Sequence, residues 1–344
     1  MHENVHRLRP ALRDLAARIR RIARGAPSAL DSPTAAHPVG MGSGDVTFPP
    51  DALTEECVES WFREQARIAP LSVLTEDTGW RHRGPGPGPG GWRELPDFDH
   101  GEPRVCIDPI DGTRPLMFDL RPAWTVIGVA GPGSGVLLQS QVELGLVTEI
   151  PTRLAGWARE LEAVRGEGCS LEEIPLFDQV AGEARNLRPI DDARVDHGHF
   201  PFFSYHPDVR PVAQSIARDF FERLRTKEGA RIEHCYDDQY TSSGGQLALL
   251  AMGQYTMIAD LRPWLRDPHG RVSQCAKPYD VSGAVVCAME AGCSVLHGSG
   301  GTLDFPLDTE TPVGFLGFAG PRTRDRLLPH LREATDSLAI ERGA

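Results

Sequence analysis

The sequence predicts an α+β or α/β protein with enough residues for about two domains. Its 344 residues are 40% hydrophobic and 24% charged, with a mean hydropathy of −0.30, as in ordinary globular chains. From about residue 186, segments typical of strands alternate with segments typical of helices, which indicates an α/β arrangement. We therefore expect an N-terminal α+β domain over 1–185 and a C-terminal α/β domain over 186–344.

In the first half, apolar residues at helical spacing predict the helices, and short runs rich in β-branched residues predict the strands. The expected helices are 6–24 and 51–68, and the expected strands are 71–75, 104–107, 123–130, 135–139 and 142–149. The run R-G-P-G-P-G-P-G-G at 83–91 predicts an irregular surface loop, with a mobile lid as the alternative.

The second half is expected to carry helices at 209–226, 246–252 and 280–291, with a strand at 256–259 that ends at Asp260. A polar turn at 241–245, Thr-Ser-Ser-Gly-Gly, precedes the second of these helices. The aromatic residues between 200 and 205 are interpreted as core. The segment 261–279 is either a surface excursion or a part of the leaving-group pocket, to which it would bring several arginines.

The most informative segment is Asp108-Pro109-Ile110-Asp111-Gly112-Thr113, which follows the strand expected at 104–107. Pro109 stiffens the chain between the two acids, so both carboxylates and the Ile110 carbonyl can converge on a hard cation such as Mg²⁺. Gly112 allows a phosphate to approach the backbone, where the amides of Gly112 and Thr113 could bind it. A solvated turn is the alternative for such a pair of aspartates. Metal and phosphate together indicate phosphoryl chemistry.

This hexapeptide resembles the D-P-[IL]-D-[GS]-T signature of the inositol monophosphatase superfamily, a group of Mg²⁺-dependent, often lithium-sensitive phosphatases. Three further segments resemble other motifs of that family, and together with the hexapeptide they occur along the chain in the family's order. They are Gly44-Asp45-Val46-Thr47 with Asp51, then Leu74-Thr75-Glu76-Asp77, and finally Tyr279-Asp280 with Gly292-Cys293. Asp77, Tyr279 and Cys293 depart from the usual residues. The resemblance spans roughly 44–293 and implies a layered α-β-α-β-α sandwich with the active site between its halves.

The resemblance also implies roles for residues. Two or three Mg²⁺ ions would be held by Glu76, Asp108, the Ile110 carbonyl, Asp111 and Asp280, and Glu76 would also serve catalysis. Thr113 and Asp51 match the pair that activates water. For Asp51, whose spacer Phe48-Pro49-Pro50 is unusual, a helix cap is the alternative.

Contacts to the phosphate or the substrate are expected from the residues around the two predicted turns. They are Asp111, Gly112, Thr113, Gly244, Gly245 and Asp260. Asp260 ends a strand that resembles the one preceding the substrate-hydroxyl acceptor in inositol-specific relatives. Nineteen residues separate Asp260 from Asp280, far more than in the family, so we expect specificity to differ from that for plain inositol phosphate.

Composition limits the partners. The net charge of −12 argues against nucleic acid, and no apolar run approaches the ~18 residues that span a bilayer. Seven cysteines without a C-x-x-C spacing indicate reduced thiols, and no P-loop or G-x-S-x-G motif is found. We expect a cytoplasmic protein, and the resemblance implies a homodimer.

The expected activity is Mg²⁺-dependent hydrolysis of a small polyol or sugar phosphate, as in an inositol monophosphatase. The alternatives are a phosphatase of the same family that acts on histidinol phosphate, fructose bisphosphate or adenosine bisphosphate, and a non-catalytic metal-binding relative.

Overall fold

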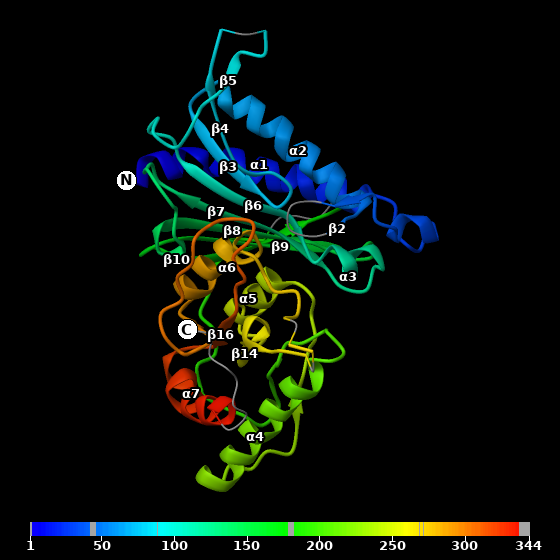
Figure 1. Ribbon diagram of the computed structural model, residues 1–344, viewed down its shortest axis with the longest axis vertical. Coiled ribbons are helices and arrows are strands. Elements are labelled where there is room, and N and C mark those ends of the chain that lie inside the picture. Colours follow the sequence, from blue (N-terminus) through cyan, green and yellow to red (C-terminus); the bar gives the residue numbers. More distant parts are fainter. Residues whose placement is uncertain are drawn as a thin grey trace.

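The structure is a computed structural model and describes residues 2–41, 46–87, 89–177, 182–267, 269–270 and 272–336. Gly44 and Asp45 of the early predicted motif lie outside these residues. Figure 1 shows five layers stacked along the long axis, in the order helices, sheet, helices, sheet, helices. The layered α-β-α-β-α sandwich expected for this chain is therefore what the structure shows. Among the described residues, no helix is both long and apolar enough to cross a membrane.

The outermost helical layer contains α1 (His2–Gly25) and α2 (Pro49–Ala66). It covers a nine-stranded sheet. In spatial order the strands are β11 (Arg185–Asn186), β10 (Gly168–Pro175), β9 (Trp157–Val164), β8 (Val142–Ile150), β7 (Ala123–Ala130), β6 (Arg104–Asp111), β3 (Leu71–Thr75), β4 (Gly79–Pro85) and β5 (Trp92–Glu94). Among the described strands of this sheet, β3 and β6 form the one parallel pair, so they end at the same edge.

The other face of the large sheet packs on α5 (Ser243–Ala251) and α6 (Pro278–Ala291). The three-stranded antiparallel sheet follows, with β14 (Met257–Asp260), β16 (Phe315–Phe318) and β15 (Ser294–His297) in that order. The last layer is α4 (Arg210–Glu228) with α7 (Pro321–Asp336). Shorter elements are β1 (Gly40–Met41), β2 (Val46–Thr47), α3 (Thr113–Met117), β12 (Gly198–His199), β13 (Cys235–Tyr236) and the 3₁₀ turns Pro33–Ala36, Gln139–Gln141 and Arg262–Trp264.

Strand β7 shows why the large sheet is buried on both faces. Its side chains alternate, so Trp124 and Val126 pack with the α5 and α6 cluster, while Ile127 and Val129 pack with the α1 and α2 cluster. A strand buried on both faces reads as a continuous apolar run, and 123–130 does so.

Helix α6 lies unusually close to this sheet. A Cβ added at Gly283 would lie 2.1 Å from the carbonyl oxygen of Ile127, a distance that no real side chain tolerates. The absence of a side chain at Gly283 therefore sets how near the helix lies to the sheet. Asp280, one turn earlier, lies close to Asp108 and Asp111 at the end of β6.

Two predicted segments differ from the structure. The run 83–91 is not wholly irregular, because Arg83, Gly84 and Pro85 belong to β4, which pairs with β3 and β5. The strand expected at 135–139 is wrong: in this fully described stretch only Leu138 forms a bridge, to Pro306, and Gly135 has a φ of 77°. All seven cysteines are free thiols, as expected.

Candidate active site

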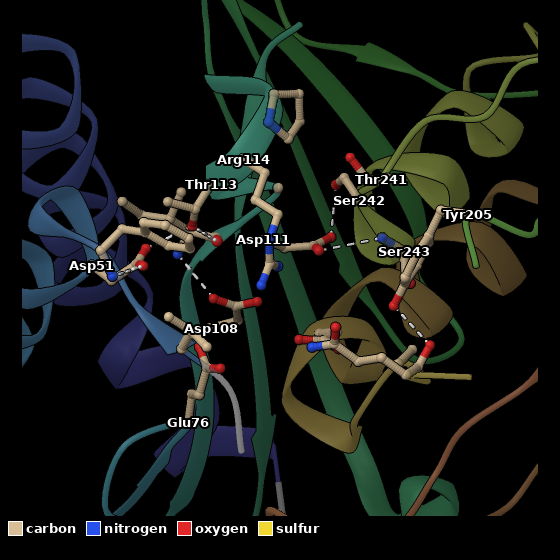
Figure 2. Close-up of a pocket in the computed structure, with 18 of the residues that line it drawn as sticks. Asp51, Glu76, Asp108, Asp111, Thr113, Arg114, Tyr205, Thr241, Ser242 and Ser243 are labelled. Atoms are coloured by element: carbon tan, nitrogen blue, oxygen red, sulfur yellow. Dashed lines mark hydrogen bonds between the residues drawn. The ribbon is translucent and has the colours of Figure 1, made fainter. Parts of the chain in front are cut away.

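A cavity of about 570 Å³ opens between the large sheet and the C-terminal half of the chain. Its lining includes most of the residues that the sequence singles out, namely Asp51, Glu76, Asp108, Ile110, Asp111, Gly112, Thr113 and Asp280. Figure 2 shows carboxylates from three separate segments directed into this space. The structure thus brings together residues that lie as far apart in sequence as 51 and 280.

The end of β6 positions the two aspartates of the central motif. The β6–β7 register shifts between Asp108 and Asp111, a β-bulge that contains Pro109, which has no amide to donate to the ladder. The Asp108 Oδ1 atom accepts a hydrogen bond from the Ile110 amide at 2.9 Å. Gly112 then adopts a φ of 100° and begins α3, so its lack of a side chain lets the chain turn toward the cavity. The strand itself continues through these acids to Asp111, further than the sequence indicates.

Three carboxylates form a cluster that could hold a cation. Ligand oxygens of Asp108, Asp111 and Asp280 all lie within 4.8 Å of one another. Glu76, which follows β3 at the same edge of the sheet, lines the same cavity. The Oδ2 atom of Asp280 also accepts the Lys277 amide at 2.7 Å, so this carboxylate caps α6 and faces the cluster at once.

The electrostatics of the cluster fit a metal ion. Burial, and then the charges of Asp280 and Asp111, raise the pKa of Asp108 well above its ordinary value. Burial and Asp280 likewise raise the pKa of Asp111 to about 7, although hydrogen bonds from Ser242 and Gly244 act in the opposite direction. Buried like charges at this separation repel unless a cation lies between them. Oxygen donors without nitrogen or sulfur select a hard cation such as Mg²⁺.

Thr113 and Asp51 are in direct contact. The Thr113 hydroxyl lies 2.6 Å from Asp51 Oδ1 and 2.9 Å from the Ile110 carbonyl oxygen. Burial raises the pKa of Asp51 to about 6, against the effect of hydrogen bonds from Thr113 and the Phe48 amide. The alternative in which Asp51 is the cap residue before Ala52 is wrong, because α2 begins at Pro49 and Phe48 is its N-cap residue. Asp51 still contributes to the cap as the third helical residue, since its Oδ2 atom accepts the Phe48 amide at 2.9 Å. The two roles use different oxygens.

The backbone amides of the two glycines at the start of α5 contact a different group from the expected phosphate. The Gly244 amide donates to Asp111 Oδ2 at 2.6 Å, and the Gly245 amide does so at 3.3 Å. Ser242 donates its hydroxyl to the same oxygen at 2.7 Å. The prediction that Gly244 and Gly245 bind phosphate is therefore revised: the positive end of this helix holds the carboxylate of Asp111. Figure 2 shows Asp111 directed at Ser242 and Ser243.

Asp260 also lies elsewhere than expected. Its side chain is fully buried, is absent from the cavity lining, and accepts hydrogen bonds from Arg262 Nε at 2.8 Å and Arg262 Nη2 at 2.6 Å. The prediction that Asp260 contacts substrate hydroxyls is therefore revised. Arg262 lines the cavity instead and donates further to Ser243 Oγ, at 2.9 Å, and to the Gln274 carbonyl.

Sequence reasoning missed three contributors to this region. Ser242 is the N-cap residue of α5, where its hydroxyl oxygen accepts the Gly245 amide, and the same hydroxyl donates to Asp111. A serine three residues before Gly245 at the start of a helix is the sequence pattern that could have indicated this role. Arg262 was identified only as one of several basic residues in the segment 261–279. Glu55 lies one helical turn after Asp51 and borders a smaller pocket with Glu76 and Asp77, and burial raises its pKa to about 7. The spacing of four residues could have indicated it.

Comparison with known proteins finds similarity in structure. No family model matches the sequence, and no curated protein does. Among solved structures, fructose-1,6-bisphosphatase from Leishmania major has a TM-score of 0.65 at 10% identity, over 96% of this chain and 93% of that one. A protein described as inositol monophosphatase-fructose 1,6 bisphosphatase has a TM-score of 0.63 at 15% identity, over 94% of this chain and 98% of that one. The chain shares the inositol monophosphatase fold.

A third structure supports this conclusion. Inositol monophosphatase II from Staphylococcus aureus has a TM-score of 0.55 at 17% identity, over 98% of this chain and 97% of that one. Coverage this complete means that the similarity extends over the whole of both chains and not over one half of the fold. The fold expected from the sequence motifs is thus confirmed.

Proposed function

We propose that the protein is a metal-dependent phosphomonoesterase that hydrolyses a small polyol or sugar phosphate. The single observation that carries the proposal is that one cavity is lined both by the carboxylate cluster of Asp108, Asp111 and Asp280 and by the Thr113–Asp51 pair. One set suits a hard cation, and the other can orient a water molecule. The inositol monophosphatase fold supports the same assignment.

The metal ligands would be the three clustered aspartates, with Glu76 and the Ile110 carbonyl. Bound there, Mg²⁺ would supply Lewis acidity, which lowers the pKa of water and neutralises charge that develops on the leaving oxygen. The net charge of the four carboxylates makes this a site that anions avoid in the absence of a cation. Binding of a phosphate ester is thus expected to depend on prior binding of the metal.

The chain's own contribution to the chemistry begins with Thr113. When its hydroxyl proton is donated to Asp51, the oxygen lone pairs of Thr113 accept a hydrogen bond from a water molecule in the cavity. The pair thereby orients the water for attack on phosphorus and directs its proton toward the Asp51 carboxylate. The phosphorus–oxygen ester bond breaks as the new bond forms, and the leaving oxygen takes up a proton.

The remainder of the cavity would receive the leaving group. Its wall contains Phe203, Tyr205, Gln239 and Gln274, in addition to Arg262. Aromatic faces and amide groups suit a ring that carries hydroxyl groups. The Arg262 charge is balanced by Asp260, so this part of the wall offers hydrogen bonds and packing more than a net positive charge.

A phosphate-release assay tests the proposal. The purified protein is incubated with inositol, fructose, histidinol and adenosine phosphates and with p-nitrophenyl phosphate, with Mg²⁺ and with EDTA. We expect release that requires Mg²⁺ and favours a hydroxyl-rich ester over p-nitrophenyl phosphate. Release from none of these esters at saturating Mg²⁺ would refute the enzyme proposal and would leave a non-catalytic metal-binding protein.

A further inference from the structure

Three potential metal ligands gather in a second place, on the C-terminal half of the chain. Ligand atoms of Asp196, His197 and His234 lie within 4.8 Å of one another. The Oδ2 atom of Asp196 is 3.7 Å from His197 Nε2, and the two imidazole rings stack with centroids 5.2 Å apart and an interplanar angle of 18°. None of the three residues lines the candidate active-site cavity.

The backbone holds this group together. Strands β12 and β13 pair in parallel directly after the two histidines, and the His197 amide donates to the His234 carbonyl at 2.8 Å. Asp196 uses Oδ1 to accept the amides of Glu233 and His234, both at 2.9 Å, so its carboxylate joins the two segments.

The backbone at His197 is also unusual. Its φ of 61° lies in the left-handed region, which is uncommon for residues other than glycine, although histidine is found there several-fold more often than most residues. This conformation accompanies the direction of its imidazole toward His234 and Asp196. Such positions cost of order 1–3 kcal/mol, and they cluster at active sites, ligand clamps and switch regions.

We propose that Asp196, His197 and His234 bind a borderline divalent cation, with Zn²⁺ as the best match. Two imidazole nitrogens and one carboxylate oxygen are the ligand set that Zn²⁺ accepts and that Mg²⁺ avoids. Zn–N bonds are about 2.0–2.1 Å long, and ligand atoms of a tetrahedral site are therefore roughly 3.3 Å apart. The ligand atoms of the three residues, which lie within 4.8 Å of one another, must approach further to bind one ion. Both histidine side chains are exposed, so the surrounding solvent leaves room for the near-parallel rings to turn toward a common ion. Water completes the coordination.

The position of the site gives it a consequence for the cavity. The segment after His197 reaches Phe203 and Tyr205, and the segment after His234 reaches Gln239 and Ser242, all of which line the cavity. A cation held by Asp196, His197 and His234 fastens the starting points of both segments to each other. We expect Zn²⁺ to stabilise this part of the fold and to limit the movement of one cavity wall.

Calorimetric titration of the full chain with Zn²⁺, at saturating Mg²⁺, tests the proposal. We compare the wild-type protein with His197→Ala, His234→Ala and Asp196→Asn, and use His37→Ala, whose side chain is also exposed, as the matched control. The wild-type and control proteins should bind one Zn²⁺ more per chain than each of the three variants. Zn²⁺ that enters the carboxylate cluster appears equally in all five proteins and so does not affect this difference.

Visible absorption of bound Co²⁺ provides a second measurement, because its bands report nitrogen ligands and low coordination number. The bands should be lost in His197→Ala and retained in His37→Ala. Equal Zn²⁺ stoichiometry in all five proteins, or Co²⁺ bands that persist in the double variant His197→Ala/His234→Ala, would overturn the proposal. Neither measurement uses a phosphate ester, so the result is independent of the proposed hydrolase activity.

Discussion

Thr113 and Asp51 are joined by a hydrogen bond of 2.6 Å that links the end of the central motif to the first turn of α2. The second oxygen of Asp51 is occupied by the Phe48 amide at 2.9 Å. Because each oxygen has its own partner, the carboxylate cannot rotate freely, and Oδ1 stays directed at Thr113. A residue that caps a helix can thus also be a well-oriented proton acceptor.

Removal of the Thr113 hydroxyl should lower turnover strongly. In Thr113→Ala the water molecule loses its acceptor, and Asp51 loses the hydroxyl that links it to that water. Loss of such proton-transfer assistance typically costs about 10²–10⁴-fold in rate. Steady-state kinetics with the best substrate of the panel should show this fall in kcat with little change in KM. Thr226→Ala, at an exposed position of α4, is the control, and a comparable loss in both variants would contradict the assignment.

Asp108→Asn should abolish turnover and yet stabilise the protein in the absence of metal. The substitution removes one of three mutually repelling carboxylates, so the metal-free variant should melt at a higher temperature than the metal-free wild type. Addition of Mg²⁺ should raise Tm in the wild type and much less in the variant, since ligand binding stabilises only the protein that binds it. Thermal melts with EDTA and with Mg²⁺ measure both effects. Near-normal turnover of Asp108→Asn would refute its role.

Asp260→Ala should destabilise the fold and should not discriminate between substrates. The change leaves the guanidinium of Arg262 buried without its partner, which typically costs about 3–5 kcal/mol. Replacement of both residues, as in Asp260→Leu/Arg262→Met, should recover a large part of this loss. Urea unfolding of the two variants measures it. If Asp260→Ala instead lowers activity only toward hydroxyl-rich esters, the carboxylate acts on the substrate after all.

Gly283→Ala should separate α6 from the large sheet. The added methyl group meets the Ile127 carbonyl at 2.1 Å, and neither backbone can yield without a shift of the helix. Overpacking of this kind typically costs about 1–3 kcal/mol, and a shift of α6 would also move Asp280. We expect a lower Tm together with weaker Mg²⁺ binding by calorimetry. Gly25→Ala, where an added methyl group contacts nothing within 4 Å, should change neither.

Asp191 should contribute a pH-dependent part of the stability. Burial alone would raise its pKa, but hydrogen bonds from the Arg322 amide and from Thr323 outweigh it and lower the pKa. A depressed pKa in the folded state stabilises the fold above the unfolded value of about 3.9, and this stabilisation disappears as the pH falls through the folded value. The difference in Tm between the wild type and Asp191→Asn should therefore shrink between about pH 5 and pH 2. A constant difference would assign the effect to the hydrogen bonds alone.

The sequence predicts best those features that depend on local pattern. Strand 123–130 and the helix around Asp280 match the structure because a continuous apolar run, or a small-residue helix, has few other solutions. The strand Gly79–Pro85 was missed because its pairing partners override the Gly and Pro signals of the run 83–91.

In the candidate site, too, the sequence predicts which residues take part better than it predicts their contacts. Motif order identifies the acids that meet in the cavity, whereas it does not reveal what each polar group contacts. Asp260 was expected to contact substrate hydroxyls, but its carboxylate instead accepts hydrogen bonds from the guanidinium of Arg262, two residues later in the chain. The amides of Gly244 and Gly245 are engaged by Asp111 from a segment more than 130 residues earlier. Neither contact has a signature in the spacing of the residues involved.

The composition of the carboxylate cluster also bears on how the chain folds. Asp108 and Asp111 are synthesised long before Asp280, which belongs to α6 in the second half of the chain. An N-terminal half that folds first has two of the clustered acids without the third, and so it lacks the full cation site. If the cluster binds Mg²⁺ as proposed, the full ligand set is complete only when α6 docks on the large sheet. The ion would stabilise the protein only after this last docking step. Its removal should therefore accelerate unfolding more than it slows folding.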